Sequence, residues 1–178
     1  MDGKLLELFP EIEEIKDTAI REKTLDTLTD AMKSGGWNYT DLDIVPFTLL
    51  IEGIGVSFRQ HTRAVTQMAI ACARIMDQQY REHYRINFDY LIAGAILHDV
   101  GKLLEYRRTD SGFVKSACGK LLRHPFSGAG LCTKHGLPDE VVHIVAVHAK
   151  EGAGGYRSPE AVAVHHADFI NFEPLRDL

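Results

Sequence analysis

Hydrophobic side chains recur every three or four residues along most of the chain, which is the spacing of one face of an α-helix. In the first part of the chain this pattern predicts helices over residues 4–16 and 18–33. The Gly35-Gly36 pair is expected to end the second of them. A shorter helix is predicted over about 41–51, with a proline in its first turn.

The middle of the chain carries two stronger patterns. Ser57 is a good N-cap for a long helix over about 58–80, and on that helix His61 shares a face with Val65 and other apolar residues. His61 is therefore expected to point inward. A very apolar helix is predicted over 88–97, and Gly101 is expected to terminate it just after a His-Asp pair.

The last third of the chain alternates helices with polar connections. Residues 105–117 are polar and lack a clear period, so they predict a loop or a small hairpin. Helices are expected over about 120–135, from Pro138 to His148, and from Pro159 until just before Pro174, with a flexible glycine-rich loop at 151–155. The chain is thus predicted to be all-α, with a helical extension at 1–50 packed on a helical bundle at 51–178.

Composition narrows the class of protein further. The chain has 178 residues, 45% of them hydrophobic, and no apolar run approaches the roughly 20 residues of a membrane-spanning helix. The amino-terminal residues are acidic and periodic, unlike a secretory signal, and the three cysteines form no CxxC motif. These features predict a cytoplasmic protein with reduced thiols and no membrane partner. The net charge of −5 argues against binding to duplex nucleic acid, but not against a small anionic ligand.

Six side chains of the kinds that bind metals recur over roughly a hundred residues. Imidazole and carboxylate groups suit divalent iron, manganese, nickel, cobalt or zinc. Three or four such groups fill one site, and six can hold two ions that share a carboxylate. The candidate ligands are His61, His98, Asp99, His124, His148 and Asp168.

The order H…HD…H…H…D, with the sequence Ile96-Leu97-His98-Asp99-Val100-Gly101-Lys102 at its centre, resembles the HD-domain metal-dependent phosphohydrolase superfamily. The resemblance covers about residues 50–172. It implies an all-α HD fold and hydrolysis of a phosphate ester, mono- or diester, of a nucleotide or another small phosphorylated metabolite. The cofactors it implies are divalent metal ions, two if all six ligands are used.

The family pattern and the shape of a carboxylate together suggest how the ligands divide. Asp99 has two oxygens and could bridge two ions, which a histidine cannot do. One ion would be held by His61, His98, Asp99 and Asp168. The other would be held by His124, His148 and the second oxygen of Asp99. A hydroxide bridging the ions would attack the phosphorus.

Cationic side chains near these positions are candidate substrate contacts. The resemblance implies that Lys102, the lysine of the HDxGK sequence, neutralises a phosphate oxygen, and the alternative is a surface lysine after a helix end. Arg63, Arg123 and Arg157 could also face an anionic substrate. The remaining histidines, of which His165 could hydrogen-bond to a ligand, are expected to be structural or solvated: His83, His135, His143, His165 and His166.

Two other functions fit the same residues. A di-iron oxygenase of the myo-inositol oxygenase type would use a similar ligand set, but it would require redox-active iron. A non-catalytic module that only binds a nucleotide is the third possibility, although retention of all six ligand positions speaks against it. Substrate, metal identity and oligomeric state are not fixed by the sequence.

Overall fold

The computed structural model describes residues 2–51 and 53–176, and the regular secondary structure of this part of the chain is helical apart from one small hairpin. The predicted all-α fold is confirmed. The hairpin pairs β1 with β2 in antiparallel fashion, with Tyr106 opposite Lys115. The elements run in the order α1 (Gly3–Leu8), η1 (Pro10–Glu14), α2 (Thr18–Gly35), η2 (Tyr39–Asp43), α3 (Phe58–Tyr80), α4 (Phe88–Leu97), α5 (Lys102–Glu105), β1 (Tyr106–Thr109), β2 (Gly112–Lys115), α6 (Ala117–Leu121), α7 (His124–Lys134), α8 (Asp139–Val147), η3 (Lys150–Gly152) and α9 (Pro159–Arg176).

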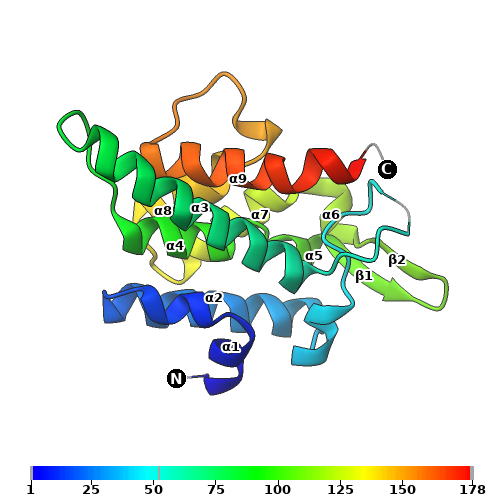
Figure 1. The fold of residues 1–178 in the computed structure, drawn as a ribbon. Coiled ribbons are helices and arrows are strands. Elements are labelled where there is room, and N and C mark those ends of the chain that lie inside the picture. Colours follow the sequence, from blue (N-terminus) through cyan, green and yellow to red (C-terminus); the bar gives the residue numbers. More distant parts are fainter. Residues whose placement is uncertain (1, 52, 177–178) are drawn as a thin grey trace.

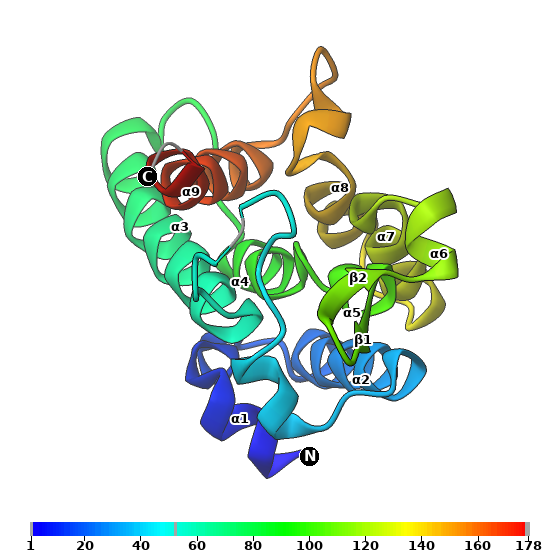
Figure 2. The same cartoon turned by 90° about the vertical axis from the view of Figure 1, so that its right-hand side faces the viewer.

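Helix α4 lies at the centre of the bundle. It packs against α2, α3, α8 and α9, and Figure 2 shows it end-on with these helices around it. Every residue from Leu91 to Leu97 is buried, as the strongly apolar sequence predicts. Gly94 allows a close approach to α8, because a Cβ there would lie 2.6 Å from Ile144. The residues that follow Leu97 therefore lie in the middle of the protein.

The amino-terminal elements lie beneath this bundle (Figure 1). Helix α2 forms as predicted, with the Asp17 carboxylate capping its start and Gly36 in the left-handed conformation after its end. The helix predicted over 4–16 is wrong, because Pro10 cannot continue α1 and starts the 3₁₀ turn η1 instead. Leu5, Phe9 and other residues of this part belong to the same hydrophobic cluster as α4. The division into 1–50 and 51–178 stays a prediction.

Three other boundaries differ from expectation. The helix predicted over 41–51 is replaced by η2 and an irregular segment, in which Pro46 pairs with Ser57 through an isolated β-bridge. The helix predicted over 120–135 is divided into α6 and α7. Helix α9 continues through Pro174, whose ring lies in the last turn. The hairpin allowed for within 105–117 and the helix over 58–80 are both confirmed.

Gly101 has a different structural role from that of the helix terminator predicted from the sequence. Its φ of −63° is right-handed, so it does not act as a left-handed helix terminator. A Cβ at this position would lie 2.1 Å from the carbonyl oxygen of His124 and 2.6 Å from Ser127 Oγ. Glycine is therefore required because the backbone of α7 passes directly against the turn that follows α4.

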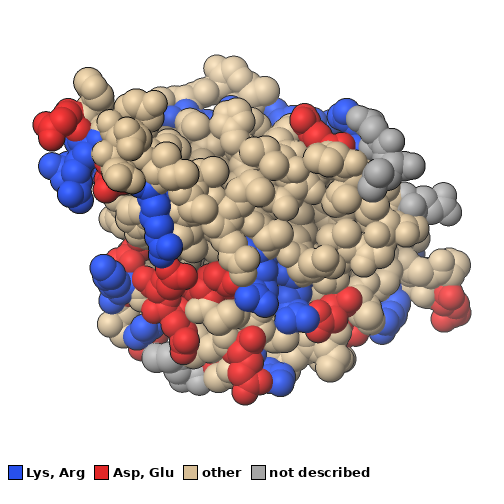
Figure 3. Space-filling view, in the orientation of Figure 1, with Lys and Arg blue, Asp and Glu red and all other residues tan. Residues whose placement is uncertain are grey.

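The surface carries charges of both signs. Figure 3 shows basic and acidic side chains next to one another along the lower part of this face, below a largely uncharged region. Among the described helices, none combines the length and the apolar character that crossing a bilayer requires.

Candidate metal centre

Five different elements bring the six predicted ligands to one place. His61 lies in the first turn of α3, and His98 and Asp99 follow the end of α4. The first residue of α7, His124, faces the residue that follows α8, His148. Asp168 comes from the middle of α9 and completes the group listed above. The side chains converge because all of these elements surround the buried end of α4.

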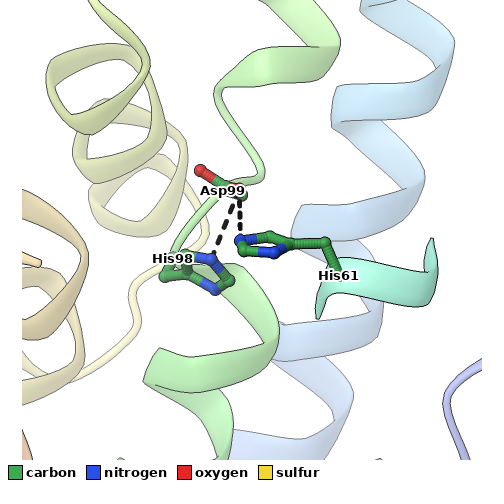
Figure 4. Close-up of side chains that lie close together, drawn as sticks. All are labelled: His61, His98 and Asp99. Atoms are coloured by element: carbon green, nitrogen blue, oxygen red, sulfur yellow. Dashed lines mark ion pairs between the residues drawn. The ribbon is translucent and has the colours of Figure 1, made fainter. Parts of the chain in front are cut away.

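One side of the cluster gathers around Asp99 Oδ2. His61 Nε2 lies 3.5 Å from this oxygen and His98 Nε2 lies 3.3 Å from it (Figure 4). Asp168 Oδ1 is 3.0 Å from His61 Nε2 and 3.9 Å from His98 Nε2. We call His61, His98 and Asp168 the Oδ2 half of the cluster.

The other side gathers around Asp99 Oδ1. His124 Nε2 lies 3.3 Å from this oxygen and His148 Nε2 lies 3.7 Å from it. The two Nε2 atoms are 3.2 Å apart. We call His124 and His148 the Oδ1 half. The two oxygens of Asp99 thus face the two sets of side chains into which the sequence divides the ligands, and the role of these side chains as ligands stays a prediction.

The hydrogen bonds around the rings leave metal-binding atoms free. Nδ1 of His98 donates to the carbonyl of Ala95 at 2.6 Å, and Nδ1 of His148 donates to that of Val145 at 2.7 Å. When Nδ1 carries the proton of a neutral imidazole, Nε2 has a lone pair. His98 Nε2 is buried without a hydrogen-bond partner in the structure. A buried unpartnered acceptor is costly, and a cation at the cluster would satisfy it.

Burial and charge set the protonation of this cluster. Burial lowers the pKa of His61, and it lowers the pKa of His124 to about 4. Burial alone would raise the pKa of Asp99, but Lys102 and His98 outweigh it and hold that pKa well below its usual value. Burial opposes charge on His98 too, yet the adjacent Asp99 carboxylate raises its pKa. In the metal-free protein, the ammonium group of Lys102 therefore offsets the charge of Asp99, and bound divalent ions would offset it further.

Lys102 is part of the cluster. The alternative of a surface lysine is wrong, because the residue is only 8% exposed. Its Nζ donates to Asp99 Oδ2 at 2.6 Å and to the carbonyl of Phe47 at 2.5 Å. Burial alone would lower the pKa of Lys102, but the Asp99 carboxylate raises it, so the side chain stays charged. The Phe47 ring also lies 4.6 Å from the ring of His61, which shields this side of the cluster from water.

The predicted arginine contacts are all engaged with other groups of the protein. Arg63 donates to Glu11 through Nε and Nη2. Arg157 donates to the carbonyls of Val147 and Ala149, next to His148.

Arg123 lies between two carboxylates. It contacts Glu105 at 2.9 Å and Glu151 at 3.0 Å, and its side chain is 35% exposed. The substrate-binding role of all three arginines stays a prediction.

Glu105 touches the cluster although the sequence did not identify it. Its side chain is 1% exposed, and Oε2 accepts from the backbone N–H of His124 at 2.7 Å and lies 3.2 Å from His124 Nδ1. Burial would raise the pKa of Glu105, but the contacts with His124 and Arg123 lower it to about 2. The available signal was a carboxylate one helical turn beyond Lys102, directly after two leucines.

The other histidines lie outside the cluster. His165 Nδ1 contacts the backbone oxygen of His148 at 2.5 Å, and not the side chain of a proposed ligand. His143 accepts from the Ser158 N–H, and His135 pairs with Asp30. These contacts fit the structural roles expected for them.

Among the described residues, two surface hollows are lined by residues other than those of the cluster. The larger, of about 990 Å³, lies between η1, the end of α3 and the start of α4. The smaller, of about 690 Å³, is lined by residues of the 43–57 segment and by Phe113. Pro46 and Thr48 border this smaller hollow, so Phe47 connects it to His61.

Comparison with known proteins agrees with this geometry. The HD domain family model matches residues 58–171, and the chain belongs to the HD-domain metal-dependent phosphohydrolase superfamily. One relative, a dihydroneopterin 2',3'-cyclic phosphate phosphodiesterase of Methanocaldococcus jannaschii, is 30% identical over 167 residues. The match covers 88% of the present chain and 64% of the length of that relative. No solved structure shows a significant match.

Proposed function

We propose that the chain is a metal-dependent phosphohydrolase that uses two divalent ions to hydrolyse a phosphate ester. The observation that supports this most directly is the position of Asp99. Its two oxygens face separate sets of imidazoles, with His61 and His98 on one side and His124 and His148 on the other. A single carboxylate placed in this way suits a two-metal site.

The residues that would hold the ions are the two halves of the cluster and the shared Asp99. When bound, such ions supply Lewis acidity toward phosphoryl oxygens and lower the pKa of water. The protein presents unprotonated Nε2 atoms to them, because carbonyl oxygens hold the Nδ1 protons of His98 and His148. Phe47 excludes water from the His61 side.

Lys102 and Arg123 are the proposed contacts for the anionic substrate. Lys102 Nζ uses two donors on Asp99 and Phe47, so a third remains for a phosphate oxygen. Arg123 is partly exposed beside His124. Arg63 and Arg157 are retained in this role only as predictions, since Glu11 and two backbone carbonyls occupy the donors described above.

The finer proposal concerns the substrate. The relative is named as a phosphodiesterase of dihydroneopterin 2',3'-cyclic phosphate. We infer that the present chain also acts on a small phosphate diester, with cyclic 2',3'-phosphates as the first compounds to test. The net charge of −5 is compatible with a small substrate whose charge is met locally by ions and by Lys102.

The test is elemental analysis of the purified protein, followed by assays of the metal-free and Mn²⁺-loaded forms under nitrogen. The assay panel comprises bis-p-nitrophenyl phosphate, p-nitrophenyl phosphate, nucleoside 2',3'-cyclic phosphates and dihydroneopterin 2',3'-cyclic phosphate. We expect about two ions per chain and metal-dependent hydrolysis of the diesters. Activity that requires iron and oxygen would indicate an oxygenase instead. Metal-loaded protein that binds these compounds and hydrolyses none would indicate a non-catalytic binding module.

A further inference from the structure

The histidines of the cluster differ in how their Nδ1 atoms are held. His98 and His148 each follow the end of a helix, and each Nδ1 contacts the carbonyl three residues earlier in the same helix. His124 is the first residue of α7, so it has no preceding helical turn to supply such a carbonyl. A different acceptor is needed at this position, and Glu105 lies there.

Only donors surround the Glu105 carboxylate among the described contacts. Oε2 faces the backbone N–H and Nδ1 of His124, while Oε1 faces Arg123 Nη1 at 2.9 Å and Lys115 Nζ at 3.5 Å. A carboxylate in such surroundings accepts hydrogen bonds and does not donate them. His124 Nδ1 therefore carries a proton, and the neutral ring presents a lone pair at Nε2.

This tautomer has a consequence in the Oδ1 half. The Nε2 atoms of His124 and His148 lie 3.2 Å apart, and both Nδ1 protons are committed to other acceptors. Two lone pairs facing one another, with the oxygen of Asp99 beside them, repel unless a cation lies between them. Glu105 thus prepares the Oδ1 half for a cation by excluding the hydrogen bond that the two rings could otherwise share.

Glu105 lies where α5 packs against both α6 and α7. It ends α5, and its backbone oxygen accepts from Ser116, just before α6. Gly119 of α6 leaves room for it, since a Cβ there would lie 2.2 Å from the Glu105 carbonyl oxygen. The backbone position of Glu105 is therefore fixed by contacts that do not involve His124.

We propose that Glu105 is a positioning residue that holds His124 in the Nδ1-protonated form and so determines cation binding in the Oδ1 half. The predicted effect on cation binding rests on the proposed two-metal function. The tautomer of His124 can be measured without metal. Glu105→Gln is the informative variant, because a glutamine fills the same space while its NH₂ group can donate to Nδ1. Glu11→Gln is the matched control: Glu11 is also a buried carboxylate held by an arginine, and it lies in η1.

The first measurement is the ¹⁵N NMR spectrum of the histidine rings in metal-free protein at neutral pH, with His124 assigned from a His124→Asn variant. We expect protonated Nδ1 at His124 in the wild type and a shift toward protonated Nε2 in Glu105→Gln. Wild-type protein with its proton on Nε2 would overturn the proposal without any variant, so a Glu105→Gln protein that fails to fold leaves it testable.

The second measurement is calorimetric titration with Mn²⁺. We expect two sites in the wild type and in Glu11→Gln, and one site weakened about tenfold to a hundredfold in Glu105→Gln. An unchanged tautomer together with unchanged affinity in Glu105→Gln would refute the role of Glu105. If the wild type binds no metal, the proposed function fails, whereas the NMR result still decides what Glu105 does.

Discussion

The two halves of the cluster are built in different ways. The Oδ2 half is carried by α3, by the end of α4 and by α9, which pack closely in the centre of the protein. The Oδ1 half is carried by the start of α7 and the end of α8, and a polar network of Glu105, Arg123 and Glu151 supports it from outside. Helix packing therefore positions both halves, but the Oδ1 half depends in addition on a few partly buried charges.

The halves also differ in the number of side chains that face their shared carboxylate. The Oδ2 half offers two imidazoles and Asp168, while the Oδ1 half offers two imidazoles alone. Loss of one imidazole should consequently leave a usable metal site in the Oδ2 half but not in the Oδ1 half. The predictions below test this contrast.

The largest effect is expected from Asp99→Ala, because Asp99 is the one group shared by both halves. We expect loss of metal from both sites and a fall in turnover of about a thousandfold or more, equivalent to about 4 kcal/mol of transition-state stabilisation. Elemental analysis and a diester assay measure the two effects. Asp99→Asn, which keeps the volume and can still accept from Lys102, controls for misfolding. An active Asp99→Ala protein would contradict the bridging role.

The contrast itself is tested by a pair of variants, His148→Ala and His61→Ala. We expect the first to lower the metal content from about two ions to about one, because a single imidazole and a shared carboxylate make a poor site. The second should keep both ions at saturating Mn²⁺, with the affinity of one site reduced at least tenfold, or about 1.4 kcal/mol. Equal stoichiometries in the two variants would show that the halves are not different in this respect.

How far the sequence predicts this arrangement depends on the kind of contact. The candidate ligands and their expected division around Asp99 follow from the resemblance to the HD family and from the two oxygens of a carboxylate, and helix periodicity places His61 inward. Glu105 could not be found in this way, because its role depends on a contact between α5 and α7 that no local pattern encodes. The error at Gly101 has the same origin, since a glycine required for close packing looks like one required for a turn.

Gly101→Ala should damage the packing between α4 and the Oδ1 half. A Cβ would lie 2.1 Å from the His124 carbonyl oxygen and 2.8 Å from the Gly128 nitrogen, so the backbone of α7 must move. We expect a loss of about 2–3 kcal/mol in the free energy of unfolding, or about 5–10 °C in Tm. The site that weakens should be the one lost in His148→Ala.

The matched control is Gly130→Ala, a glycine-to-alanine change within α7 itself. A Cβ at Gly130 meets no atom within 4 Å, so we expect Tm to stay level or rise slightly. Calorimetric melting of both variants makes the comparison. A Gly101→Ala protein as stable as Gly130→Ala would show that α7 can move aside without cost.

The smallest effects concern the contacts that brace each half from the amino-terminal elements. Glu11 of η1 accepts hydrogen bonds from Arg63 and Gln67 of α3. Asp30 of α2 pairs with Lys134, the last residue of α7, and with His135, which follows it. We expect Asp30→Asn to lower the free energy of unfolding by about 0.5–1 kcal/mol, because Lys134 is largely exposed, and to leave metal content unchanged.

The pH dependence of this brace has a definite sign. Hydrogen bonds from Lys134 and His135 lower the pKa of Asp30 from 3.8 to about 2, so the unfolded chain takes up its proton before the folded protein does. The stabilisation is therefore complete above about pH 4 and disappears as the pH falls toward 2. The difference in Tm between wild type and Asp30→Asn should follow this course, whereas Glu7→Gln, which removes the exposed pair with Lys4, should show little difference at any pH. A wild-type advantage that persists unchanged at pH 2 would mean that Asp30 stabilises α7 by packing and not by charge.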